Sequence, residues 1–227
     1  MKIKKIVKLF LVVLVCTSNS DALLAQKYGI KAGLNLSNMR IIDNDADYGR
    51  NFDINPGFHL GATAAFPLTK IFSIETGLFL ATRGYKSSEE EIIEGETYAK
   101  EARTNLLYLD IPVTAKASYA VGKAKLYVVF GPYASVGLSG RLTYDQSYNS
   151  ATIPEDESVT WGSAEDAANF KRMDYGLAMG AGIAINAFHI GYIYHLGLAN
   201  ISPATANGLE INNRVLGVSV GYQFGGK

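Results

Sequence analysis

The last strand-like segment of the chain, residues 214–224, constrains the fold more than any other feature. Successive side chains of an extended strand lie on opposite faces, so a period of two separates an apolar face from a polar one. Here the even positions are apolar and the odd positions are small or polar, in the order Leu216, Gly217, Val218, Ser219, Val220, Gly221, Tyr222, Gln223 and Phe224. A closing strand of this kind is typical of barrels that span the outer membrane.

The beginning of the chain predicts a cleaved signal peptide, residues 1–25. Lysines at the start precede an apolar run over residues 6–15, which is too short to span a bilayer as a helix. Cleavage after Ala22 and cleavage after Ala25 both fit. Cys16 is the only cysteine and falls in this segment, so we expect residues 26–227 to form one outer-membrane β-barrel domain without a thiol.

Eight segments share the alternating pattern, and each is long enough to cross a bilayer at a tilt. They are residues 28–36, 58–66, 72–82, 107–119, 126–138, 175–185, 188–198 and 214–224. The pattern predicts an all-β fold, an eight-stranded antiparallel up-and-down transmembrane β-barrel. A soluble barrel shows the same period with its apolar face inward, so periodicity alone leaves both open.

The joins between these segments favour the membrane barrel, because short and long joins alternate. The short joins are 67–70, 120–124 and 186–187, and the long ones are 40–56, 86–105, 142–170 and 200–213. The four long joins hold 17 acidic and 5 basic residues. This layout predicts short periplasmic turns and acidic extracellular loops, hence contact with outer-membrane lipid in a Gram-negative bacterium.

Aromatic residues gather beside the short joins, on the face shared with the apolar positions. An aromatic ring with an apolar body prefers the boundary between water and lipid, so a ring of such residues marks a membrane interface. The predicted ring comprises Tyr28, Phe66, Phe72, Tyr119, Phe188 and Phe224.

Several motifs resemble the PorT-like outer-membrane β-barrels of Gram-negative bacteria. They are residues 28–38, 108–113, 131–133, 174–176 with 180–182, 197–202, and the closing strand. The resemblance covers the whole chain after the signal peptide and implies an eight-stranded barrel in the outer membrane. The family's namesake is linked to secretion of surface proteins, a role that fold alone does not transfer.

Six charged residues have the parity of the barrel interior: Lys31, Glu75, Arg83, Asp110, Lys116 and Asp174. Unpaired charge in a confined interior is costly, so acids and bases are expected to lie together there. We predict two ion pairs, Glu75 with Lys116 and Arg83 with Asp110. Lys31 and Asp174 are further members, and we interpret all six as structural charges of the lumen.

Glycines and prolines predict details of the packing. Many inward positions are glycine, which either leaves a wet thread or admits large inward side chains from neighbouring strands; we favour the packed lumen. Pro112 and Pro132 fall inside strands, where each removes a donor from the ladder. We therefore expect bulges or locally broken pairing at both.

Sites for chemistry are weakly indicated. The three histidines, His59, His189 and His195, have inward parity, and only His59 with Asp110 suggests a catalytic pair. Residues 43–54 resemble a calcium loop, yet Tyr48 and Ile54 occupy the positions where glycine and glutamate are wanted. We expect no enzyme, no metal, no cofactor and no nucleic-acid partner.

The function expected is that of a structural or interaction protein of the cell envelope, possessing a packed lumen and acidic loops. The long join 142–170 is the expected contact surface for a protein partner, because it holds Tyr144, Tyr148 and Trp161 among acids. The alternatives are a small channel or uptake accessory for a solute, a lumen or loop enzyme, and a periplasmic ligand-binding barrel, which requires inward apolar faces.

Overall fold

The structure is a computed structural model that describes residues 26–44, 46–47, 53–93, 96–148, 151–165 and 167–225. The predicted signal peptide, residues 1–25, lies outside these described residues. Within them, no helix has both the length and the apolar character needed to cross a membrane.

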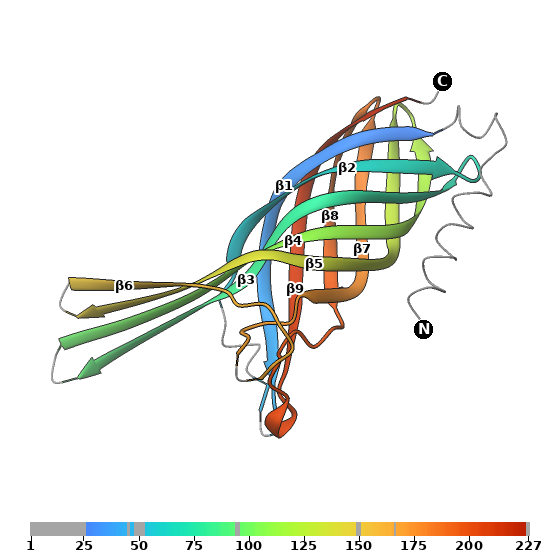
Figure 1. Cartoon of the computed structure of the whole chain (residues 1–227). Helices are drawn as coiled ribbons and strands as arrows, with labels where there is room; N and C mark the ends of the chain where they lie inside the picture. Colours follow the sequence, from blue (N-terminus) through green and yellow to red (C-terminus); the bar gives the residue numbers. More distant parts are fainter. Residues whose placement is uncertain are drawn as a thin grey trace.

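Nine antiparallel strands make up the described part of the chain, and eight of them form a closed ring (Figure 1). Each strand of the ring pairs with its neighbour in sequence, β9 pairs with β1, and pairing of β4 with β5 completes the circle. The remaining strand, β6, lies outside the ring and pairs only with the outer part of β5. The strands are β1 (Lys27–Ile42), β2 (Asn55–Pro67), β3 (Phe72–Ile93), β4 (Glu96–Val121), β5 (Ala124–Tyr148), β6 (Ala151–Ser158), β7 (Met173–Ile185), β8 (Phe188–Gly197) and β9 (Glu210–Phe224).

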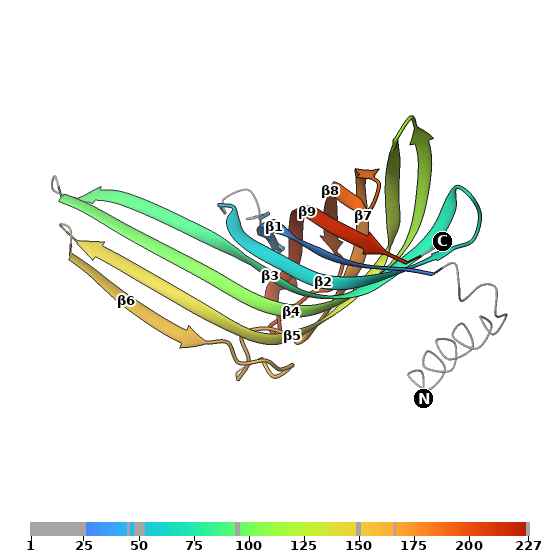
Figure 2. The same cartoon turned by 90° about the horizontal axis from the view of Figure 1, so that it is seen from above.

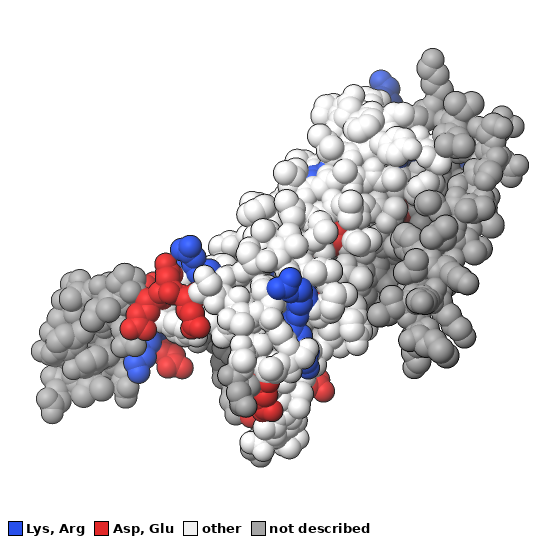
Figure 3. Space-filling view, in the orientation of Figure 1, with Lys and Arg blue, Asp and Glu red and all other residues white. Residues whose placement is uncertain are grey.

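The apolar faces point outward. On β1, Leu34 is 69% exposed while the adjacent Asn35 is 3% exposed, and the same alternation runs around the ring. Figure 3 shows a barrel wall almost free of charge on this side. A soluble ligand-binding barrel needs the opposite arrangement, so that alternative is wrong and the predicted transmembrane barrel is confirmed.

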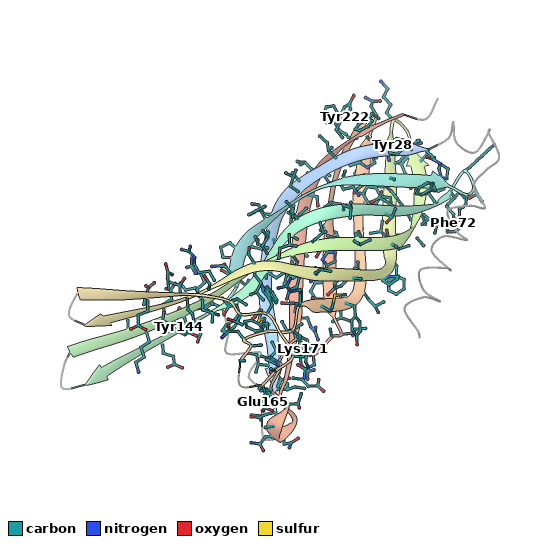
Figure 4. All side chains as sticks on the ribbon, viewed as in Figure 1. Tyr28, Phe72, Tyr144, Glu165, Lys171 and Tyr222 are labelled. Atoms are coloured by element: carbon teal, nitrogen blue, oxygen red, sulfur yellow. The ribbon has the colours of Figure 1, made fainter. Side chains whose placement is uncertain are left out.

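The predicted aromatic ring lies at the end of the barrel that carries the short turns. Figure 4 shows Tyr28 and Phe72 at this end. Tyr28, Phe72, Tyr119, Phe188 and Phe224 are exposed near the ends of their strands, whereas the predicted member Phe66 is partly buried. Tyr222 adds to this ring, because its side chain contacts the Phe188 ring edge-on at 5.2 Å. The ring therefore marks the membrane interface on the short-turn side.

The described residues of 86–105 and of 142–158 lie in strands rather than loops, which corrects the sequence expectation for these parts of two long joins. Strands β3, β4 and β5 continue past the barrel wall and, with β6, form a four-stranded sheet that we call the extension. Figures 1 and 2 show it leaving the barrel at an angle to the outer ends of β1 and β9. Acids in these segments face basic and hydroxyl side chains on other positions of the sheet, as Glu101 faces Lys86 and Asp156 faces Thr143.

Salt bridges on the extension show where the lipid ends. Lys86 and Arg103 lie 2.7 and 3.0 Å from the carboxylate of Glu101, and Arg141 lies 3.2 Å from Asp156. These positions continue the outward parity that is apolar on the barrel wall. Because charge on a lipid-facing position is costly, the extension stands in water beyond the membrane.

Pairing is interrupted at the two prolines, as predicted. Residues 113 and 114 of β4 have no partner on β5, and residues 111 and 112 have none on β3, although the register on either side is unchanged. The backbones of β4 and β5 approach each other closely at this point, which explains the inward-facing Gly131 of β5. A Cβ on Gly131 would lie 2.2 Å from the Val113 carbonyl oxygen. The shift of register in β4 lies elsewhere, between Leu107 and Tyr108.

Candidate functional site: the barrel lumen

A hydrophobic plug closes the long-loop end of the lumen. Side chains from β1, β4 and β5 and from the loops after β6 and β8 form one buried cluster. Its buried members are Met39, Leu106, Tyr108, Leu142, Val159, Phe170, Ala199 and Ile201. The segment between β6 and β7 thus folds back over the mouth instead of extending into solvent.

Trp161 belongs to this plug, which corrects its expected place on an exposed contact surface. Its ring lies edge-on to Tyr108, with 5.7 Å between the ring centroids. A Cβ on Gly137 would lie 2.4 Å from the indole, so only glycine admits the ring there. Tyr144 is 43% exposed on the extension, and the side chain of Tyr148 lies outside what the structure describes.

Directly beneath the plug lies a charge cluster centred on Arg83. Its guanidinium contacts Asp174, donates to Asp110 at 2.6 Å and to Ser135 at 3.1 Å, and lies between the rings of Tyr108 and Tyr133. We call this set the outer cluster. The structure thus brings together the predicted pair Arg83 and Asp110, and adds Asp174 as a second carboxylate.

With both carboxylates ionised, the outer cluster carries one more negative charge than positive, and its charged side chains are almost fully buried. Asn213 donates to Asp174 at 2.9 Å and so satisfies part of this carboxylate. One oxygen each of Asp110 and Asp174 has no hydrogen-bond partner among the described residues. Because uncompensated buried charge is unfavourable, the field of this cluster favours positive charge elsewhere in the lumen.

A second cluster of opposite sign lies nearer the short turns. Glu75 accepts from Lys116 at 3.0 Å and also contacts Lys31, so two ammonium groups share one carboxylate. The Lys116 ammonium lies 4.3 Å from the centre of the Tyr127 ring. We call this set the inner cluster. It unites the predicted pair Glu75 and Lys116 with Lys31.

Inward glycines make room for large side chains, as the packed-lumen interpretation expects. A Cβ on Gly61 would lie 2.4 Å from the Phe79 ring, and one on Gly182 would lie 2.4 Å from the Tyr127 hydroxyl. The glycines therefore fit against bulky neighbours instead of lining a continuous open thread.

Between the two clusters remains a cavity of about 70 Å³. Its lining includes the three histidines together with Glu75 and Asp110. A space of this size holds a few water molecules, since each needs on the order of 10–15 Å³ by the same measure. It is too small for a metabolite.

His59 lies at the centre of a hydrogen-bonded chain across this cavity. The Asn35 amide nitrogen donates to the carbonyls of Phe58 and Thr82, at 3.1 and 2.9 Å, which turns the amide oxygen toward His59. This oxygen can only accept, so His59 Nδ1 donates to it over 2.7 Å. Nε2 then faces the hydroxyl of Ser219 at 2.8 Å. No ion pair joins His59 to Asp110 within the described ranges.

The order hydroxyl, imidazole and amide matches a nucleophilic triad in connectivity, but its surroundings do not. Ser219 is paired with Gly33 on one side and with Gly191 on the other, so the nearby backbone N–H groups serve the ladders and form no oxyanion hole. The hydrogen bonds from Asn35 through His59 to Ser219 instead link β1, β2 and β9. Sequence reasoning missed Asn35 and Ser219, although the inward parity of two polar residues was a usable signal.

The other two histidines pack against aromatic rings. His189 packs against Tyr127 and His195 against Tyr133, with ring centroids 5.8 and 4.9 Å apart. In the described part of the chain, no group of histidine and carboxylate side chains is arranged to hold a metal ion. Much of the calcium-like segment 43–54 lies outside the described residues.

Comparison with known proteins places the chain in a family. A family model described as outer membrane protein beta-barrel domain matches residues 20–202. Among solved structures, the attachment invasion locus protein Ail of Yersinia pestis is 16% identical with a TM-score of 0.37, over 88% of this chain and 99% of Ail. Neisserial surface protein A is 11% identical with a TM-score of 0.35, over 87% of this chain and 96% of that protein.

No curated protein matches the chain. The family model, by contrast, spans most of its length, and its description agrees with the outward apolar faces and the closed ring. The chain therefore belongs to the family of the outer membrane protein beta-barrel domain, and it is a β-barrel of the outer membrane of a Gram-negative bacterium.

Proposed function

We propose that this barrel is a non-conducting, non-enzymatic interaction protein of the cell envelope, and that its extension contacts a protein partner outside the cell. The observation that carries the proposal is that β3, β4 and β5 continue beyond the barrel wall and pair with β6 in water. A sheet this long is not needed to close the ring. Its exposed Tyr144 and its cross-strand charges suit recognition of a partner.

Closure of the lumen supports the non-conducting part of the proposal. The plug and the outer cluster occupy the same end of the barrel, and Arg83 is only 1% exposed. A solute crossing there has to displace a guanidinium held by two carboxylates. The described geometry therefore favours a role at the surface over transport.

Membership of the PorT-like group is a finer part of the same proposal. Its support is the motif of the first strand, residues 28–38, and the segment 108–113, which supplies Tyr108 and Asp110 to the closure of the lumen. Only the namesake of the group connects this barrel with secretion, and fold alone does not transfer that role, so an association with secretion is a secondary expectation.

Site-specific photo-crosslinking in living cells tests the contact surface. A photoreactive amino acid at Tyr144 is expected to give one discrete adduct, identified by mass spectrometry. The same amino acid at Val121, an equally exposed position beside a short turn, is the matched control and is expected not to give that adduct. Absence of any adduct from Tyr144 and from Arg141 would contradict the proposal.

A small channel is the second candidate, because the cavity between the two clusters, whose lining includes Glu75, Asp110 and three histidines, already occupies part of the lumen. Planar-bilayer recording of the purified barrel decides between the two functions. We expect no conductance steps from the unmodified protein. Discrete steps at neutral pH would favour the channel and argue against the proposal.

A further inference from the structure

The lumen opens at its short-turn end into a pocket of about 170 Å³, which we call the vestibule. The last inward-facing residues of several strands form its wall, so its composition is set by the same parity that fills the lumen. Four lysines from separate places in the chain line it: Lys27 on β1, Lys70 in the β2–β3 turn, Lys116 on β4 and Lys125 on β5.

Among the described residues, no carboxylate lines the vestibule. Glu75 lies one layer deeper, where Lys31 and Lys116 already share it. Among the described residues, Lys27, Lys70 and Lys125 form no ion pair. The vestibule is thus a concave surface with one sign of charge, and a cleft of this kind concentrates counterions.

Two features make the vestibule more than a group of surface lysines. Lys116 is only 6% exposed, so one ammonium is fixed at the base of the pocket by Glu75 and the Tyr127 ring. His189 lines the same pocket, and its buried Nδ1 has no hydrogen-bond partner in the described part of the chain. A buried polar atom without a partner is uncommon and indicates an unfilled interaction.

We propose that the vestibule binds a phosphate-type oxyanion from the periplasmic side. Lysine binds phosphate as a compact point charge with three rotatable donors, so several lysines around one pocket can contact several oxygens of one phosphate. Here lysines from three strands and one turn line the same pocket, and none of the described arginines does. Hydroxyl groups of Ser73 and Ser118 on its wall supply further donors for oxygen atoms.

Titration calorimetry with inorganic diphosphate tests this proposal on the full-length barrel, folded in zwitterionic micelles at low salt. The double variant Lys27→Gln/Lys125→Gln removes two rim charges that make no ion pair and is expected to fold. Binding by this variant is expected to be roughly tenfold weaker, as two exposed charge contacts together imply. Lys123→Gln is the matched control, because Lys123 is exposed beside the vestibule but does not line it.

The outcomes separate a site from a general charge effect. Weakening confined to the double variant supports the vestibule. Equal weakening by Lys123→Gln, unchanged binding by the double variant, or no binding of diphosphate by the intact barrel would each overturn the proposal.

A second titration identifies the source of the phosphate. Micelles doped with phosphatidylglycerol are expected to suppress diphosphate binding if a lipid headgroup occupies the vestibule, and to leave it unchanged if the natural ligand is a soluble phosphate. Both results retain the phosphate chemistry. Neither titration depends on the extension, so absence of diphosphate binding would leave the proposed surface role intact.

Discussion

The guanidinium of Arg83 lies against two carboxylates and two aromatic rings in a part of the lumen with almost no exposure. Each of these neighbours comes from a different position in the chain, so one side chain links β3 to β4, β5 and β7. Removing it leaves two buried carboxylates without their counter-charge, which is far more costly than the absence of the whole cluster.

We therefore predict that Arg83→Ala destabilises the folded barrel by about 3–5 kcal/mol. The measurement is urea unfolding in lipid vesicles, followed by gel mobility. Neutralising the carboxylates as well, in Arg83→Leu/Asp110→Asn/Asp174→Asn, is expected to recover most of the loss. Arg141→Ala, which breaks an exposed pair with Asp156, is expected to cost roughly 0–1 kcal/mol. Equal losses in the two single variants would contradict this account of Arg83.

Ser219 gives a second prediction at the residue scale. Because no backbone donors are free to stabilise an oxyanion beside it, we expect no labelling of Ser219 by a fluorophosphonate probe. Ser219→Ala is expected to cost about 1 kcal/mol through the lost hydrogen bond to His59. Labelling that disappears in Ser219→Ala would revive the enzyme hypothesis.

At the scale of elements, the segment between β6 and β7 acts as a lid over the lumen. Trp161 is the only tryptophan of the chain, so its fluorescence reports on this lid directly. We predict blue-shifted emission that acrylamide quenches poorly, and a red shift in Gly137→Val, because the added side chain occupies the place of the indole. Leu138→Ala, a lipid-facing change next to it, is the control and is expected to leave the emission unchanged.

The extension depends on charge in a way that pH can reveal. Hydrogen bonding from Lys86 is the largest favourable influence that lowers the pKa of Glu101 below its ordinary value, and Arg103 adds to it. A carboxyl group whose pKa is lowered in the folded state stabilises the fold at pH values above its unfolded pKa of about 4.3. This contribution is lost as the pH falls through the folded pKa.

Glu101→Gln is therefore expected to weaken the β3–β4 hairpin at pH 7, by less than about 1 kcal/mol because the pair is largely exposed. The difference from the unmodified protein is expected to disappear below the folded pKa. Hydrogen exchange of the hairpin amides, corrected for intrinsic rates at each pH, measures it. Glu155→Gln, which removes the same charge from an exposed residue that forms no ion pair among the described residues, serves as the control. A difference that persists in acid would contradict the assignment.

For the whole molecule, closure of the ring predicts resistance to unfolding by detergent. Every strand of the ring has two partners, and β9 meets β1 along 15 residue pairs. Unheated protein from the outer-membrane fraction is expected to migrate faster in a detergent gel than boiled protein. Deleting β9 opens two new edges, and we expect this variant to show no heat-dependent shift.

The local period of the sequence already determined the eight membrane-crossing segments and the aromatic ring, and the alternation of short and long joins determined that the apolar faces point outward. Each of these depends on alternation within one strand or on the length of a join, which are properties of neighbouring residues. The same parity identified the six lumen charges, and the two predicted pairs lie on the adjacent strands β3 and β4.

Only the tertiary structure decided what meets across the lumen and above it. Whether Arg83 reaches Asp174, whether His59 reaches Ser219 and whether Trp161 folds over Gly137 depend on the stagger between strands and on the path of a long join. The period of two is the same for every stagger, so the sequence pattern alone does not select one. The extension was missed for a related reason: its strands are charged on the face that lipid would otherwise make apolar, and only pairing with β6 and its neighbours reveals them as a sheet.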